Sequence, residues 1–357
     1  MRVYLLVLLV AAAVTYVAVP IVRHVALVSN ALTPVRARDV HSTPIPRLGG
    51  VAMFVGFASA VTVASQIPYL ADVIDSSAWA VVLGAGMVCF LGVVDDLWEL
   101  DWWAKLSGQI LAAGVMAWRG VQLITFPVGG VTLGSSRLSL FSTVLVVLAV
   151  INAVNFVDGL DGLAAGIIGI GASAFFLYVY VLTRTTQPAS YTSLAATVIA
   201  ALIGICVGFL PHNFHPSTIF MGDSGSLALG GAMVAFALFT RTELLLLVIA
   251  LIPVLEVFSV IVQKFVFKTS RKRSVAAGEK PLHAHRYFRM TPFHHHMEKV
   301  GVNGKYSIDK RGIAPGTVSS GEVNSVFRLW VVNALCVLVA LALFFGDWFS
   351  QTSGVIH

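Results

Sequence analysis

Charged residues are scarce in this sequence. Only 11% of its 357 residues are Asp, Glu, Lys or Arg, whereas 57% are hydrophobic. Since soluble domains carry about 25% charged residues, a water-soluble globular protein is excluded. Cysteine is scarce too: Cys89, Cys206 and Cys336 all fall within apolar runs without metal-ligand spacing, which argues against a disulfide framework or a zinc site. The composition therefore indicates an integral membrane protein.

The apolar residues gather in about ten runs, each long enough to cross the ~30 Å hydrocarbon core of a bilayer. The first run has no A-x-A cleavage site before Pro20, so we expect a retained helix and not a cleaved signal peptide. The expected fold is an all-α integral membrane protein of about ten transmembrane helices, forming one domain over residues 1–357. The runs lie at 4–22, 49–67, 78–94, 104–119, 138–154, 163–183, 193–211, 226–240, 243–266 and 327–346.

Lysine and arginine predict the orientation of these helices. Most of the 23 lie in the first, third, fifth, seventh and ninth connections or at helix ends facing them. By the positive-inside rule these connections are cytoplasmic and both termini lie outside. The same bias accounts for the net charge of +6, so no nucleic-acid partner is expected. The exceptions are Arg2, Arg119, Arg137, Arg184 and Arg241.

Five polar motifs fall in the same odd-numbered connections, whereas the outer connections are short and carry no comparable cluster. This distribution predicts a single active site in the cytoplasmic loops. The ninth connection, residues 267–326, is a large basic loop rich in histidine. The motifs occupy residues 36–50, 95–105, 152–166, 211–226 and 283–299.

The densest motif is NAVNFVDGLDGLAAG, residues 152–166. Asn152, Asn155, Asp158 and Asp161 recur every three residues, so a helical turn would crowd them on one face. Ionisable groups at a bilayer edge are costly unless they are paired, hydrated or metal-bound, which favours a functional site. The alternative is a polar loop that caps a membrane helix, but a cap needs one Asn or Asp and not four.

Acidic residues elsewhere suggest a metal centre. Asp95 and Asp96 end the third apolar run, and adjacent carboxylates favour a cation, either a metal or a lysine such as Lys105. A solvated helix end is the simpler alternative for this pair. Asp223 lies at the start of the eighth predicted helix, where it would cap the helix or bind metal. Oxygen ligands without accompanying cysteine favour Mg2+ or Mn2+ over Zn2+.

The histidine-rich loop suggests a basic wall. Three consecutive histidines cannot all face one ion from a regular helix or strand, so a cationic, hydrogen-bonding surface for a diphosphate or a sugar is favoured over zinc. A patch for lipid headgroups is the alternative. The set comprises His283, His285, His294, His295 and His296, beside Arg286, Arg289 and Lys299.

These features together suggest metal-dependent phosphoryl transfer between a soluble diphosphate and a lipid phosphate. An ion-coupled transporter is the second hypothesis, but it predicts acidic groups near helix centres, where only Glu256 qualifies. A cytoplasm-facing binding scaffold is the third hypothesis, and loss of metal dependence would favour it.

Four motifs carry a resemblance over nearly the whole chain: GVVDD at 92–96, NAVNFVDGLDGLAAG at 152–166, IFMGDSGSLALGG at 219–231 and FRMTPFHHHMEK at 288–299. The chain resembles the polyprenyl-phosphate N-acetylhexosamine-1-phosphate transferases, the superfamily of bacterial MraY and WecA/TagO enzymes. The resemblance implies Mg2+-dependent transfer from a UDP-N-acetylhexosamine to undecaprenyl phosphate, with release of UMP, on the cytoplasmic face of the bacterial inner membrane. It leaves a homodimer, and a one-step or a covalent mechanism, open.

The resemblance also implies roles for individual residues. Asp223 looks like the Mg2+ ligand, with Asp95 and Asp96 as the pair beside it, and Asp95 is the residue proposed to deprotonate the lipid phosphate. Lys105 resembles a family lysine, and Phe220 is placed to stack on uracil. The other expected substrate-binding residues are His41, Arg47, Asn152, Asn155, Asp158, Asp161, Asn213, His294, His295 and His296.

The two ends of the chain disagree about the donor. Up to about Gly225, DVHSTPIPRLGG, NFVDGLDG and GFLPHNFHP are similar to the WecA/TagO branch, which transfers GlcNAc-1-phosphate. From Leu227 onward, LALGG, MTPFHHHMEK and FRLW resemble MraY, whose donor is UDP-MurNAc-pentapeptide. The larger matched share favours UDP-GlcNAc. Because discrimination should lie in loops that differ between the branches, we hypothesise that the histidine-rich loop touches the sugar.

Overall fold

Helices account for the regular structure of the described residues, apart from one isolated β-bridge between Leu32 and Pro46. The computed structural model describes residues 1–33, 44–124, 135–185, 190–240, 246, 250–276, 288, 291–300 and 317–353. The helices are α1 (Arg2–Val28), α2 (Gly49–Ser65), α3 (Pro68–Ala71), α4 (Ser76–Trp98), α5 (Trp102–Trp118), α6 (Ser136–Val157), α7 (Leu163–Thr185), α8 (Ser190–Asn213), α9 (Gly222–Thr240), α11 (Leu251–Ala276), α12 (Phe293–Val300) and α13 (Thr317–Ser353).

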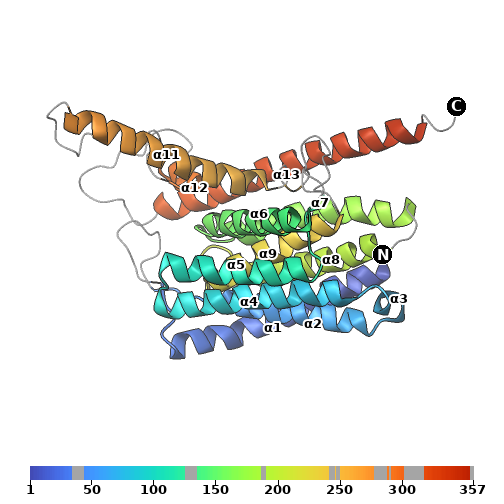
Figure 1. Ribbon diagram of the computed structural model, residues 1–357. Helices are drawn as coiled ribbons and strands as arrows, with labels where there is room; N and C mark the ends of the chain where they lie inside the picture. The colour runs from blue at the N-terminus through green and yellow to red at the C-terminus, as the bar shows by residue number, and fades with distance from the viewer. Residues whose placement is uncertain are drawn as a thin grey trace.

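The expected all-α membrane fold is confirmed. Six of the described helices, α1, α4, α6, α7, α8 and α13, are long and apolar enough to cross a membrane, and α2 and α9 are shorter apolar helices. The N-terminus and the far end of α13 lie toward the same end of the bundle (Figure 1). The number of crossings, and the side on which the termini lie, stay predictions.

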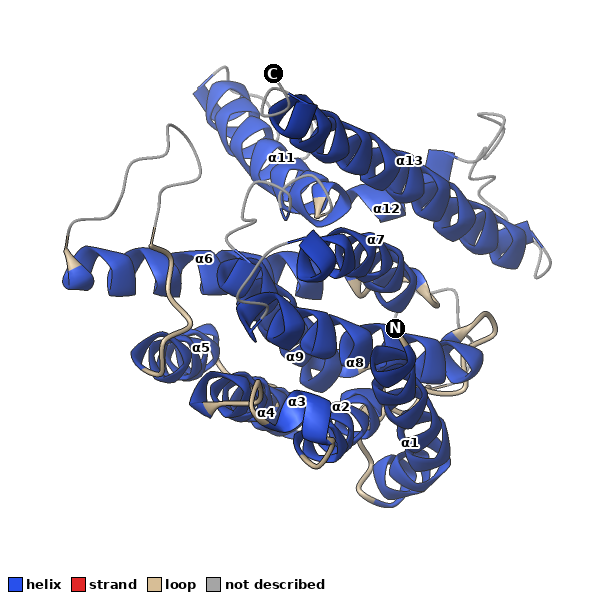
Figure 2. Ribbon diagram, turned by 90° about the vertical axis from the view of Figure 1, so that its right-hand side faces the viewer, coloured by secondary structure: helices blue, strands red, loops and turns tan. Residues whose placement is uncertain are grey.

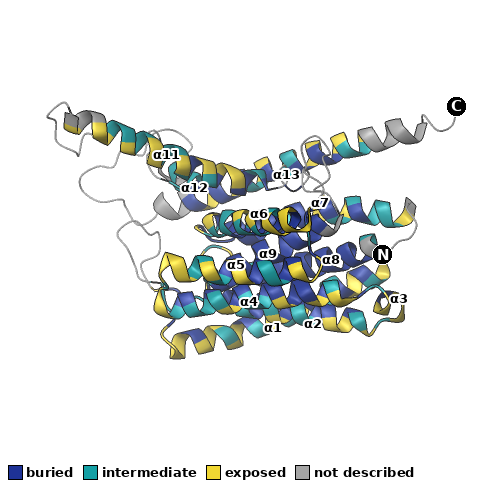
Figure 3. Ribbon diagram, viewed as in Figure 1, coloured by how far each residue is buried: buried dark blue, intermediate teal, exposed yellow. Residues whose placement is uncertain are grey.

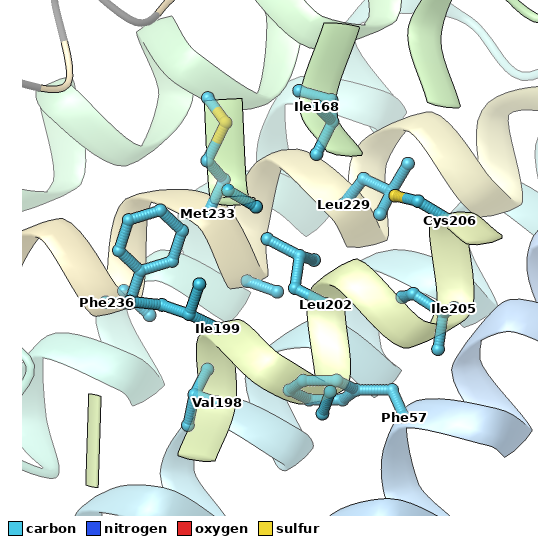
Figure 4. Packing of buried hydrophobic residues seen from close by; sticks show 14 of the residues in the cluster. Phe57, Ile168, Val198, Ile199, Leu202, Ile205, Cys206, Leu229, Met233 and Phe236 are labelled. Carbon is cyan, nitrogen blue, oxygen red and sulfur yellow. The ribbon is translucent and has the colours of Figure 1, made fainter. Parts of the chain in front are cut away.

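Helix α8 forms the centre of the bundle. Its apolar side chains are almost entirely enclosed. Leu202 and Cys206 lie in one cluster with Phe57 of α2, Ile168 of α7 and Phe236 of α9 (Figure 4). Lipid does not drive apolar helices together, so close packing of this kind must supply the stabilisation. The core therefore fixes α9, whose first turn carries Asp223.

The remaining helices lie on two sides of this core. Helices α1, α2, α4 and α5 gather on one side, whereas α11, α12 and α13 form a separate layer beyond α6 and α7 (Figures 1 and 2). The outer faces carry exposed apolar residues, such as Leu9 and Val17 of α1 (Figure 3). In a bilayer these faces contact lipid, so their exposure needs no protein partner.

Several helices extend beyond the predicted apolar runs. Helix α13 begins at Thr317 and not near 327, and α11 continues to Ala276, so both enter the segment 267–326 that the sequence predicts as a loop. The ends are polar, so hydropathy does not mark them, although the backbone remains helical outside the hydrocarbon region. Helix α12 forms within the same segment.

Candidate active site

A lysine lies between two carboxylates at one end of the bundle. Lys105 Nζ lies 2.5 Å from Asp95 Oδ2 and 3.0 Å from Asp223 Oδ2. The short connection after α4, in which Glu99 adopts φ 48°, turns the chain back so that the first turns of α5 face Asp95. Asp95 Oδ1 accepts the N–H of Leu100 at 2.8 Å, which holds this turn. The structure thus brings three predicted catalytic residues together.

Asp96 holds the start of α9. Its two carboxylate oxygens accept the backbone N–H groups of Asp223 and Ser224, each at 3.1 Å. These N–H groups have no partner within their own helix, so Asp96 acts as a cap from α4. Gly222 adopts φ 68°, and a Cβ there would lie 2.5 Å from Asp96 Oδ2. Asp95 and Asp96, although adjacent, therefore make different contacts.

The four residues spaced by three do not share one face, because α6 ends at Val157. Asn155 faces the carboxylates: its Nδ2 donates to Asp223 Oδ1 and to Ser226 Oγ, both at 2.9 Å. Asn152 turns toward α5 and donates to Gln109 Oε1 at 2.8 Å. Its described contacts join α6 to α5 and do not reach Asp223.

Asp158 is the first residue after α6, and its side chain is half-buried. Burial, followed by the negative charges of Asp223 and Asp96, raises the pKa of the Asp158 carboxyl to about 8, whereas the charge of Arg47 lowers this pKa. The Arg47 Nε donates to Thr33 Oγ1 at 3.0 Å. Asp158 and Arg47 therefore belong to the same electrostatic environment as Asp223.

Asp161 and Asn213 join two loops. The Asp161 side chain, which is 3% exposed, accepts bonds from Ser217 N at 3.1 Å and Ser217 Oγ at 2.8 Å, and lies 2.9 Å from His215 Nδ1. Asn213 Oδ1 accepts the N–H of Gly162 at 3.0 Å. These contacts place the residues after α6 against those after α8. The Asp161 carboxylate therefore already has partners within the protein, although Asp161 lies only three residues after Asp158.

Glu322 of α13 reaches the same loops and was not among the expected site residues. Its Oε1 accepts the N–H of Asp161 at 3.0 Å, and its Oε2 lies 3.4 Å from His215 Nδ1. Ligand atoms of Asp161, His215 and Glu322 lie within 4.8 Å of one another, a spacing compatible with a metal ion. The hydrogen bonds among these residues instead indicate a structural role, in which Glu322 holds α13 against the two loops. The only signal in the sequence was an acidic residue just before the last apolar run.

Phe220 connects the first loop to α9. Its N–H donates to Pro46 O at 2.8 Å, and its carbonyl accepts the N–H of Gly49 at 3.0 Å. The residue after it, Met221, accepts the N–H of Gly50 at 2.9 Å. This backbone ladder fixes the segment that leads to Asp223. The Phe220 side chain is half-buried, and its stacking on uracil stays a prediction.

The three consecutive histidines lie on α12 but face different surroundings. His294 is buried, at 1% exposure, against Glu256 of α11. His295 and His296 are half-buried, and the His296 ring lies 5.5 Å from that of Phe288. The predicted basic wall thus consists, among described side chains, of His295 and His296. His41, His283, His285, Arg286 and Arg289 lie outside the described residues.

Comparisons with known proteins identify the family of this chain. Residues 78–241, which include α4 to α9 and hence the carboxylates, match the model of glycosyl transferase family 4. The decaprenyl-phosphate N-acetylglucosaminephosphotransferase of Mycolicibacterium smegmatis is 35% identical, covering 93% of this chain and 86% of that protein. The Mycobacterium tuberculosis protein of the same name is 37% identical, covering 89% and 81%.

A second kind of relative is about equally similar. The phospho-N-acetylmuramoyl-pentapeptide-transferase of Desulforudis audaxviator is 36% identical, covering 85% of this chain and 86% of that protein. Similarity over most of the chain to both kinds of relative agrees with the mixed motifs in the sequence. The chain is therefore a multi-pass membrane enzyme that belongs to glycosyl transferase family 4, the polyprenyl-phosphate N-acetylhexosamine-1-phosphate transferases.

Proposed function

We propose that this protein transfers GlcNAc-1-phosphate from UDP-GlcNAc to a polyprenyl phosphate at the cytoplasmic membrane face and releases UMP. One observation carries the proposal: Asp95, Lys105, Asn155 and Asp223, from four different helices, converge on one point. Transfer between two phosphates needs charge neutralisation and alignment more than covalent chemistry by the protein. A cluster of carboxylate, ammonium and carboxamide groups suits that need.

The same residues fit a magnesium ion. Asp95 and Asp223 offer carboxylate oxygens of the kind that Mg2+ and Mn2+ prefer, and these carboxylates already hold one positive charge, that of Lys105, between them. We therefore propose Asp223 and Asp95 as ligands. Both oxygens of Asp96 accept backbone N–H groups, which favours a positioning role over the direct ligation expected from the sequence. When bound, the ion would neutralise charge on the diphosphate.

In the proposed reaction an oxygen of the lipid phosphate attacks the β-phosphorus of UDP-GlcNAc, and the bond from that phosphorus to the bridging oxygen breaks, so UMP leaves. Lys105 would offset charge that spreads over the phosphoryl oxygens. Asn155 orients Asp223 through a hydrogen bond. Arg47 would add a cation, and Phe220 would stack on uracil.

The names of the relatives bear on the choice of acceptor lipid. Both mycobacterial proteins are named for decaprenyl phosphate, whereas the motif resemblance implies undecaprenyl phosphate. We propose decaprenyl phosphate as the preferred acceptor, because these relatives cover most of the chain. The two lipids share the phosphate group that reacts and differ in chain length.

Two UDP-sugars are candidates for the donor. UDP-MurNAc-pentapeptide is the second candidate, because the Desulforudis relative is as similar as the mycobacterial ones and the C-terminal motifs resemble MraY. Purified protein with Mg2+ and polyprenyl phosphate should release UMP from UDP-GlcNAc and not from UDP-MurNAc-pentapeptide. The reverse preference would replace the donor, and no UMP from either would reject the proposed function.

A variant controls this assay. Asp223→Ala should abolish UMP release and leave the protein folded, as judged by gel filtration in detergent. Near-normal turnover in this variant would remove Asp223 from the site.

A further inference from the structure

Glu256 is a buried carboxylate that the proposed reaction does not use. It lies on α11 within an apolar stretch, and none of its surface is exposed. An acidic side chain at membrane depth is costly unless it is paired or hydrogen-bonded, so its presence calls for a partner.

That partner is the first turn of α12. The backbone N–H of His294 donates to Glu256 Oε1 at 3.1 Å and to Oε2 at 3.3 Å, and the ring Nδ1 lies 3.3 Å from Oε1. His294 is the second residue of α12, whose first N–H groups lack partners within the helix. A negative charge is favourable there. Glu256 thus caps α12 from a neighbouring helix.

The other side of the His294 ring rests on the loop after α6. A Cβ atom built on Gly159 would overlap the ring, with Nε2 as its nearest atom, so only glycine permits this approach. Gly159 directly follows Asp158, whose pKa responds to the charge of Asp223. The contacts from Glu256 to His294 and from His294 to Gly159 therefore link α11 to the edge of the carboxylate site.

We infer that Glu256 is a positioning residue of the transferase: it holds His294, and with it the start of α12, against the loop that carries Asp158. When Nδ1–H of His294 faces the Glu256 carboxylate, Nε2 is the atom presented toward that loop. This inference rests on the proposed function, because the imidazole would position the loop of Asp158, beside which the UDP-sugar would bind.

Kinetics of a double-mutant cycle test the catalytic part. His294→Ala should lower kcat/KM for UDP-GlcNAc by about 100-fold, the scale of a misplaced group, mainly through KM. Glu256→Ala should do the same, and Glu256→Ala/His294→Ala should be no worse than His294→Ala alone. Glu256→Gln should retain part of the activity, because its amide oxygen still accepts the His294 N–H. Multiplied losses in the double variant would overturn the inference.

Hydrogen exchange tests the positioning part without any substrate. In folded Glu256→Gln and Glu256→Ala, the peptide that covers residues 291–300 should exchange faster than in the wild type. Gln263→Ala is the matched control: Gln263 lies on the same helix, and its Oε1 accepts the N–H of Phe288 at 3.0 Å and not that of His294. The control should leave KM for UDP-GlcNAc unchanged.

The outcomes separate the two proposals. Wild-type protein that releases no UMP would reject the proposed function, while faster exchange in the variants would still support the docking of α12 by Glu256. Unchanged exchange in a folded Glu256→Gln protein would overturn the inference whatever the donor. Where Glu256→Ala does not fold, Glu256→Gln decides both readouts.

Discussion

Lys105 is the only described cation that touches both Asp95 and Asp223. Without it, the two carboxylates would repel each other across the gap between α4 and α9. The ammonium also stands where phosphate charge would be neutralised in the proposed reaction. One side chain would thus serve both the fold and the proposed chemistry of the site.

Replacing Lys105 tests this double role. Lys105→Ala should lower the rate of UMP release at saturating substrates by about 100-fold. Lys105→Arg should recover part of the rate, since it keeps the charge but not the compact geometry. Arg119→Ala is the control, because Arg119 lies over Trp118 at the other end of α5. Half or more of the wild-type rate in Lys105→Ala would contradict the role.

Asp158 predicts a pH dependence of stability. Its pKa is raised from 3.8 to about 8, so the fold favours the neutral acid, and stability is lost as the pH rises through the folded pKa. Asp158→Asn is neutral at all pH values. In EDTA the variant should therefore melt higher than the wild type by a few degrees at pH 8, with a smaller gap at pH 5. Thermal unfolding in detergent measures this, and a gap that does not depend on pH would contradict the assignment.

The first turn of α9 shows how one element shapes the site. Asp96 caps it from α4, and Gly222 supplies the positive φ that brings the two together. Gly92 allows α4 to approach closely, because a Cβ there would overlap the backbone of Asp223 and Ser224. The position of the Asp223 carboxylate therefore depends on this contact between helices.

Two helix caps provide a matched test. Asp96→Ala should cost roughly 1–2 kcal/mol of stability and also lower UMP release more than about tenfold, because Asp223 loses its anchor. Asp75 caps α4 at its opposite end, accepting the N–H of Ser77 at 2.9 Å. Asp75→Ala should cost similar stability without loss of turnover. Equal activity of the two variants, measured at one temperature below both melting points, would refute the anchoring role.

Hydropathy predicted the helices well and the short elements poorly. The predicted run 163–183 corresponds to α7 at Leu163–Thr185, and 104–119 corresponds to α5 at Trp102–Trp118. The cost of burying backbone in lipid makes each long apolar run helical, so the run alone is informative. Helix α12 carries three histidines within eight residues and depends on packing against α11, which no local pattern encodes.

The candidate site was predictable in its residue types and less so in its contacts. Carboxylates at the edges of apolar runs indicated the convergence of Asp95 and Asp223. Spacing could not tell that Asn155 faces Asp223 while Asn152 faces Gln109, because that depends on where α6 ends and on which neighbour packs beside it. Glu322 accepts the N–H of Asp161 from 161 residues further along the chain, so sequence distance hid the contact.

At the scale of the whole molecule, two parts of the chain meet at one site. Helices α4 to α9, which match the family model, supply the carboxylates, whereas α11 to α13 form a layer on the α6 and α7 side (Figure 2). This layer reaches the loop after α6 twice, through His294 at Gly159 and through Glu322 at Asp161. Donor choice by the C-terminal part is consistent with that placement.

Binding of Mn2+, used in place of Mg2+ and followed by electron paramagnetic resonance, tests most directly that the carboxylates of separate helices form one metal-dependent transfer site. In the presence of UDP-GlcNAc, wild-type protein should bind one ion per chain, and Asp223→Asn should lose it. Binding of the same amount of Mn2+ by folded Asp223→Asn would contradict the account.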